Sequence, residues 1–129
     1  MSKFKVNNGF LCDDVRRENN GKLIAIGIYG NRIFVGNFPC VLNLMAFVNV
    51  SVDTTGEQRF KTRLLVDDET RSEVEIASDT VWAGSDWYPV PVGPIGFEKP
   101  STIHLQWKSE GGKWKSFASV PIEIGAAID

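Results

Sequence analysis

Residues 9–29 read GFLCDDVRRENNGKLIAIGIY, and this stretch decides the fold. Side chains alternate between two faces along Gly9–Arg17 and again along Lys22–Tyr29. Between the two segments lies the pair Asn20-Gly21, the strongest short signal for a β-hairpin, because both central residues of a type I′ turn need a positive φ. The second segment is apolar on both faces, which predicts a central strand that is covered on both sides.

The same period of two continues along the chain, and no segment shows a sustained helical period. Further strands are predicted at Arg32–Val35, Val41–Val52, Arg59–Val66, Ser72–Ala77, Thr102–Trp107 and Trp114–Ile124. A helical turn at 42–45 is an open alternative within the second of these. Seven to nine short strands predict an all-β fold, a two-sheet antiparallel sandwich that is immunoglobulin-like in style. A small β-barrel is the alternative.

Length and composition indicate one soluble domain that spans residues 1–129. The net charge of −2 gives no general attraction to nucleic acid or to an anionic membrane. No apolar run near the first residues has the length of a signal-peptide core, so we expect a cytoplasmic protein. In that compartment Cys12 and Cys40 are expected to be free and mostly buried thiols.

Two stretches together resemble a known but uncharacterised family. One is Cys12–Tyr29, which is followed by Phe38-Pro39, and the other is Ser119–Ile122 in the last strand. They resemble a domain of unknown function found in short bacterial proteins. The resemblance implies a compact β-sandwich and carries no activity with it.

The best candidate for a binding surface is the stretch Ser78–Pro100, which holds four of the six prolines and is predicted to be irregular, with a short edge strand at Ile95–Phe97 as a candidate element within it. Long connections in compact domains are often functional. Trp82, Trp87 and Tyr88 lie within it, and rigid amphipathic rings of this kind are enriched at binding hot spots. The alternative is that these rings pack on the core.

A second candidate is the charged run at residues 13–18, in which Arg16 and Arg17 can pair with carboxylates on a partner. The alternative is that this run is an edge strand, in which the charged side chains prevent aggregation through pairing with other chains.

The sequence shows no catalytic or metal-binding constellation. His104 is the single histidine, which makes a poor zinc site together with two distant cysteines. Acidic residues in the predicted loops leave calcium as an alternative; they are Asp53, Asp67, Asp68, Glu69, Asp79 and Asp86. An enzyme that uses Cys12 or Cys40 as a nucleophile would need a base within reach.

We therefore expect no enzyme and no cofactor. The first hypothesis is a cytoplasmic protein-binding module, of the kind that phages and mobile elements also encode. Its partner would be another protein or a second copy of the chain, paired through a sheet edge. The alternative hypothesis is a β-sandwich that binds a small molecule or calcium.

Overall fold

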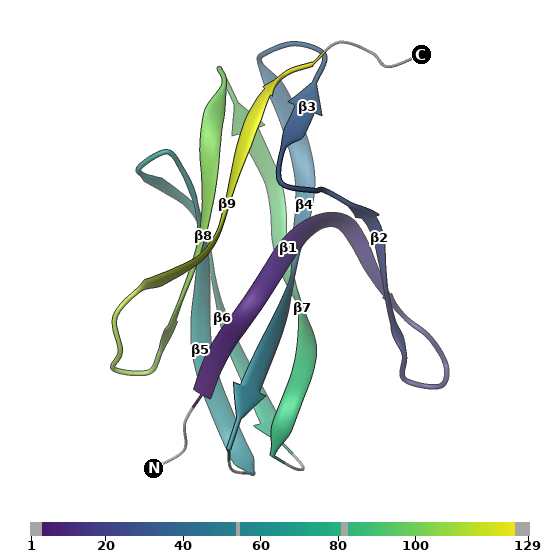
Figure 1. Ribbon diagram of the computed structural model, residues 1–129, viewed down its shortest axis with the longest axis vertical. Helices are drawn as coiled ribbons and strands as arrows, with labels where there is room; N and C mark the ends of the chain where they lie inside the picture. Colours follow the sequence, from purple (N-terminus) through teal and green to yellow (C-terminus); the bar gives the residue numbers. More distant parts are fainter. Residues whose placement is uncertain (1–3, 54, 81–82, 126–129) are drawn as a thin grey trace.

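The computed structural model describes residues 4–53, 55–80 and 83–125. These residues form nine strands and no helix (Figure 1). The strands are β1 (Phe4–Arg17), β2 (Leu23–Ile28), β3 (Ile33–Val35), β4 (Cys40–Val52), β5 (Gly56–Val66), β6 (Glu69–Thr80), β7 (Gly84–Phe97), β8 (Ser101–Ser109) and β9 (Lys115–Ile124). Residues 42–45 belong to β4, so the open alternative of a helical turn is wrong.

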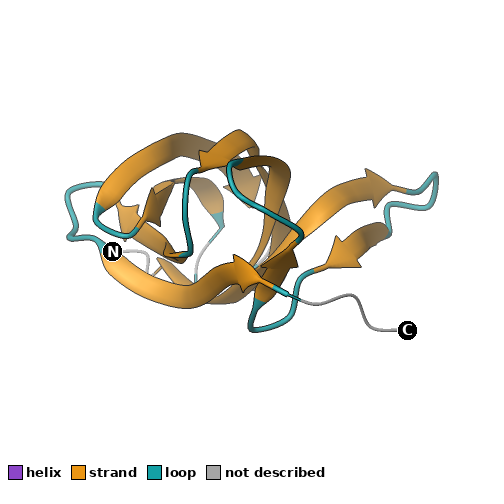
Figure 2. Ribbon diagram, turned by 90° about the horizontal axis from the view of Figure 1, so that it is seen from above, coloured by secondary structure: helices purple, strands orange, loops and turns teal. Residues whose placement is uncertain are grey.

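The strands form two sheets, with orders β2-β1-β4-β7 and β3-β9-β8-β5-β6. All pairs are antiparallel except β3 with β9. Figure 2 shows that the sheets enclose the core and that one of them is curled into a half-barrel. The predicted all-β fold with two sheets is confirmed. An immunoglobulin-like topology is not shown, because the four-stranded sheet of that fold has order A-B-E-D.

The core lies between the sheets, where the inward positions of the central strands meet. Phe60 and Leu64 on β5 are buried, as are Ile103 and Leu105 on β8. Alternation had predicted these positions. Each fully buried large apolar side chain stabilises the fold by about 1.5–3 kcal/mol relative to an exposed one.

The hairpin of β1 and β2 is confirmed, but its turn differs from the predicted one. Glu18 N–H donates to Lys22 O at 2.8 Å, and Gly21 N–H donates to Glu18 O at 2.9 Å. Of the residues in this turn only Gly21 has a positive φ, 87°. The loop therefore has three residues and ends in a glycine bulge, where a two-residue type I′ turn would need a positive φ at two positions.

The prediction that Lys22–Tyr29 is a central, doubly covered strand is wrong. β2 lies at the edge of the four-stranded sheet. β1 pairs with β4 only as far as Cys12, so the residues beyond it pair with β2 alone. The hairpin consequently extends past the rest of the sheet, as Figures 1 and 2 show.

The prediction that Ser78–Pro100 is irregular is also wrong for most of the stretch, whereas the short edge strand considered at Ile95–Phe97 is the end of an observed edge strand. Most of it is β7, which pairs with β4 along its whole length. Three prolines, Pro89, Pro91 and Pro94, lie within the strand. They are accommodated because β7 is an edge strand, and a proline there need not donate a hydrogen bond to a second neighbour.

Candidate functional site

Trp87 lies on the outer face of the four-stranded sheet, in a cluster of three aromatic rings. Its ring stacks on Phe47 with centroids 4.9 Å apart, and Phe10 lies 5.5 Å from Phe47 and 5.8 Å from Trp87. Phe47 is only 8% exposed, although it points away from the core between the sheets. The neighbouring rings thus bury it, and Trp87 itself is half-buried.

A polar network borders this cluster towards the end of β4. The Asn7 side-chain amide donates to Asn49 Oδ1 at 2.9 Å and to Ser51 Oγ at 2.6 Å. Ser51 Oγ lies 3.1 Å from Ser85 Oγ on β7. The outer face therefore changes from apolar to polar along β4.

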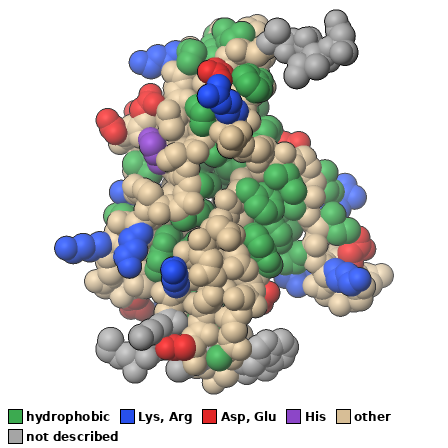
Figure 3. All heavy atoms as spheres, in the orientation of Figure 1, with side chains coloured by type: hydrophobic (Ala, Val, Ile, Leu, Met, Phe, Trp, Pro, Cys, Tyr) green, Lys and Arg blue, Asp and Glu red, His purple; other side chains and the backbone are tan. Residues whose placement is uncertain are grey.

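On the β2 side the same face carries three exposed isoleucines. Ile24, Ile26 and Ile28 are 42%, 38% and 58% exposed. Ile28 pairs with Cys12 in the register, and Cys12 pairs with Met45 on β4. Directly paired residues of antiparallel strands point to one face, so this isoleucine row and the Phe10–Phe47–Trp87 cluster share the outer face of the sheet. Figure 3 shows hydrophobic side chains gathered between the β2 hairpin and the body of the molecule.

Tyr88 points the opposite way from Trp87. Its ring is half-buried against the core, 6.1 Å from Phe60, and its hydroxyl lies 2.8 Å from Ser78 Oγ on β6. Trp82 lies outside the described residues. Trp87 and Tyr88 therefore do not form one surface.

Arg16 and Arg17 lie near the tip of the hairpin, opposite Ile24 and Leu23. Arg16 Nε is 3.7 Å from Asp14 Oδ2, and both side chains are more than half exposed. Exposed ion pairs of this kind contribute about 0–1 kcal/mol to the free energy of unfolding. Arg16 pairs with Ile24 and therefore places positive charge beside the isoleucine row, whereas Arg17 pairs with Leu23 and points to the opposite face.

Cys12 and Tyr29 lie at the base of the hairpin, beside Asp13. Cys12 is completely buried, and this burial raises the pKa of its thiol. A raised pKa lowers the thiolate fraction, which is the reactive form. Cys40 is half-buried, and neither cysteine is in a disulfide. His104 Nδ1 lies 3.0 Å from Ser119 Oγ on β9.

Tyr29 donates its hydroxyl hydrogen bond to Asp13 Oδ1 at 2.8 Å. Burial, followed by this hydrogen bond, raises the pKa of Tyr29 to about 12. The unfolded chain releases the phenolic proton near pH 10, whereas the folded chain retains it up to about 12. The contribution of the protonated Tyr29 to the free energy of unfolding is therefore complete below about pH 10 and is lost as the pH rises towards 12.

We predict that the urea midpoint of the wild type falls as the pH rises above about 10. Tyr29→Phe has no proton to lose, so its midpoint should fall less steeply over the same range. Urea titrations of both proteins at mildly and at strongly alkaline pH measure the difference. Equal slopes for the two proteins would reject the assignment of this stabilisation to Tyr29.

Three of the acidic residues considered for calcium make local contacts that are typical of turns and strand ends. Asp67 Oδ1 accepts from Thr102 N–H at 2.9 Å, and Asp86 Oδ1 accepts from Trp87 N–H at 2.8 Å. Glu69 forms an ion pair with Arg71 at 3.5 Å. Across the described part of the chain, no group of three or more His, Cys, Asp or Glu residues is placed to hold a metal ion. None of the described residues belongs to a helix that is long and apolar enough to cross a membrane.

Sequence reasoning missed a cleft on the other side of the molecule. It has a volume of about 900 Å³ and lies where the first residues of β1 meet the five-stranded sheet. Gln58 lines this cleft and is 6% exposed. The sequence did contain a sign of this cleft. Gln58 is a polar residue, and it lies at an inward position, two residues before the apolar Phe60 on the same face.

The architecture defines an all-β protein of the two-sheet class, with a projecting edge hairpin. The chain belongs to the family of unknown function DUF6941, which matches residues 8–111. The expected membership of an uncharacterised family is thus confirmed. Comparison with curated proteins finds no significant match.

Proposed function

We propose that this chain is a non-enzymatic, cytoplasmic protein-binding module that contacts its partner through the edge of β2. The observation that carries the proposal is the row of exposed isoleucines on an edge strand that projects from the body. An edge strand offers backbone N–H and C=O groups to another strand, and alternate side chains add an apolar contact.

The partner that fits this edge best is a second copy of the chain. A two-fold axis requires that each contacting surface be complementary to itself. Ile24, Ile26 and Ile28 are symmetric about Ile26, so an antiparallel copy centred there places Ile24 opposite Ile28 and Ile26 opposite itself. Both meeting side chains are then apolar at every position of the row.

The test is the mass of the protein in solution, from micromolar to submillimolar concentration. We expect a dimer for the wild type and a monomer for Ile26→Lys, because the substitution places two ammonium groups against each other at the axis. Val41→Lys is the matched control, since Val41 is 67% exposed on β4, which does not contact β2. Val41→Lys should remain dimeric and keep the thermal stability of the wild type. Ile26→Lys should keep the thermal stability that the wild type has at concentrations where it is monomeric, because association itself raises the melting temperature.

A wild type that is monomeric at every concentration would reject pairing with a second copy. The same variants then decide whether another protein binds this edge. A partner that is captured by the wild type and Val41→Lys, but not by Ile26→Lys, would support the β2 edge as its site. Capture by all three proteins would remove β2 from the proposal.

A further inference from the structure

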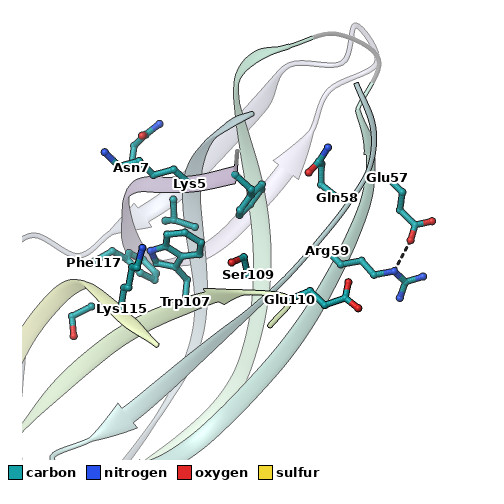
Figure 4. A pocket seen from close by; sticks show the side chains of 13 residues that line it. Lys5, Asn7, Glu57, Gln58, Arg59, Trp107, Ser109, Glu110, Lys115 and Phe117 are labelled. Atoms are coloured by element: carbon teal, nitrogen blue, oxygen red, sulfur yellow. Dashed lines mark hydrogen bonds and ion pairs between the residues drawn. The ribbon is translucent and has the colours of Figure 1, made fainter. Parts of the chain in front are cut away.

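The cleft at the start of β1 lies at the other end of that strand from the hairpin. The close-up in Figure 4 shows Trp107 beside Lys5, Lys115 and Phe117, with Gln58 and Arg59 apart from this group and Ser109 between the two. Small-molecule sites commonly have volumes of about 300–1,000 Å³ and combine an apolar lining with a few placed polar groups. At about 900 Å³ the cleft is within this range.

Gln58 is the most informative residue of the cleft. Its side chain is 94% buried, that is, 6% exposed, at an inward position of β5. Among the described residues, no side-chain or backbone group forms a hydrogen bond with its side-chain amide. A buried amide without a partner costs free energy, so a ligand in the cleft that exchanges hydrogen bonds with this amide removes that cost.

Aromatic rings form the apolar part of the cleft. Phe4 lies 5.8 Å from Trp107 in an edge-to-face arrangement and 4.5 Å from Phe60. Trp107 is only 6% exposed and is thus held in place by its surroundings. Aromatic side chains that are held in place favour the binding of a flat or apolar part of a ligand.

The two sides of the cleft differ in free charge. Lys5 and Lys115 are exposed and have no ion-pair partner among the described residues. Lys115 Nζ lies 5.4 Å from the centre of the Trp107 ring. On the opposite side Arg59 is already paired with Glu57 and Glu75, and Glu110 adds a carboxylate. A ligand anion is therefore favoured on the lysine side.

We infer that the cleft binds a small carboxylic acid that also carries an amide and an apolar or aromatic ring. The ring lies against Phe4 and Trp107, the amide exchanges hydrogen bonds with Gln58, and the carboxylate lies near Lys5 and Lys115. This inference is independent of the proposed function, because none of these residues belongs to β2.

The probe for the test is hippurate, which joins a phenyl ring, an amide and a carboxylate in one small molecule. Its binding is followed by NMR through the indole N–H of Trp107, which is assigned with Trp107→Phe. We expect saturable shifts with hippurate and weaker binding of its uncharged methyl ester. Ile26→Lys should bind hippurate as the wild type does, which separates this site from the β2 edge.

Two variants test the named contacts. Gln58→Leu removes the amide at similar volume, and Lys115→Gln removes a charge at an exposed position; each should weaken hippurate binding by roughly tenfold. Thr62→Val is the control, because Thr62 is equally buried on the same face of β5 but does not line the cleft. It should bind hippurate as the wild type does.

The absence of a saturable shift at Trp107 would overturn the inference. Unchanged affinity in Gln58→Leu would also overturn it, since the amide would then have no role. If Gln58→Leu does not fold, Lys115→Gln and the methyl ester still decide whether the carboxylate is recognised.

Discussion

Phe60→Ala should lower the free energy of unfolding by about 3–5 kcal/mol, which is at the top of the range for single substitutions in a core. Phe60 is 1% exposed at the centre of the core. Its ring lies 4.5 Å from Phe4 and 6.1 Å from Tyr88, so it joins β5 to strands of the other sheet. Removing it leaves a cavity that strands of both sheets border, and a close-packed interior collapses into such a space only in part.

Urea denaturation measures this loss, with Phe34→Ala as the matched control. Phe34 is a strand residue of the same type but is 59% exposed, so its replacement should change stability by less than about 1 kcal/mol. Because small domains have only about 5–15 kcal/mol of stability in total, Phe60→Ala should be partly unfolded on mild warming. A loss no larger than that of the control would show that Phe60 does not join the two sheets.

The sequence predicts the central strands well because one face of each is buried. In Arg59–Val66 the residues at alternate positions are apolar or small and meet the other sheet, and the same holds for Thr102–Trp107. A shift of one residue in either strand would expose every one of these side chains. Burial therefore fixes both the strand and its orientation.

The two edge strands of the four-stranded sheet were predicted poorly, because an edge is defined by the absence of a neighbour, which no local pattern records. The prolines of β7 suggested an irregular segment, yet they fit a strand that pairs on one side only. The apolar residues of β2 suggested coverage on both faces, yet three isoleucines remain exposed. Both errors concern the four-stranded sheet, where β2 and β7 are the two edges.

The candidate sites depend on contacts between distant segments, so the sequence predicted them only in part. Trp87 was singled out as a candidate binding residue, but its companions Phe10 and Phe47 on the outer face come from other strands. The cleft unites β1, β5, β8 and β9, and only the polar Gln58 at an inward position gave a local sign of it. Strand register, which is set by the whole sheet, decides which of these residues meet.

Gly27→Ala should lower the free energy of unfolding by about 2–3 kcal/mol, through strain at the base of the hairpin. Gly27 has a φ of 68°, in the left-handed region, where an added Cβ costs about 1–2 kcal/mol. The same Cβ would overlap the Asp13 carboxylate. Asp13 would have to turn away from the Tyr29 hydroxyl, and the loss of that hydrogen bond costs about 0.5–1.5 kcal/mol more.

Gly30→Ala is the control for this substitution, since an added Cβ at Gly30 meets no atom within 4 Å and its φ is not in the left-handed region.

The mechanism also predicts a spectroscopic change, because the hydrogen bond to Asp13 is one cause of the raised pKa of Tyr29. In Gly27→Ala the tyrosinate absorbance of Tyr29 should therefore appear at lower pH than in the wild type. Hydrogen exchange should locate the damage, with faster exchange along Leu23–Ile28 than in the wild type and little change in β5 and β8, because β2 pairs with β1 alone. If stability falls while the titration of Tyr29 stays unchanged, backbone strain at Gly27 accounts for the loss and displacement of Asp13 does not.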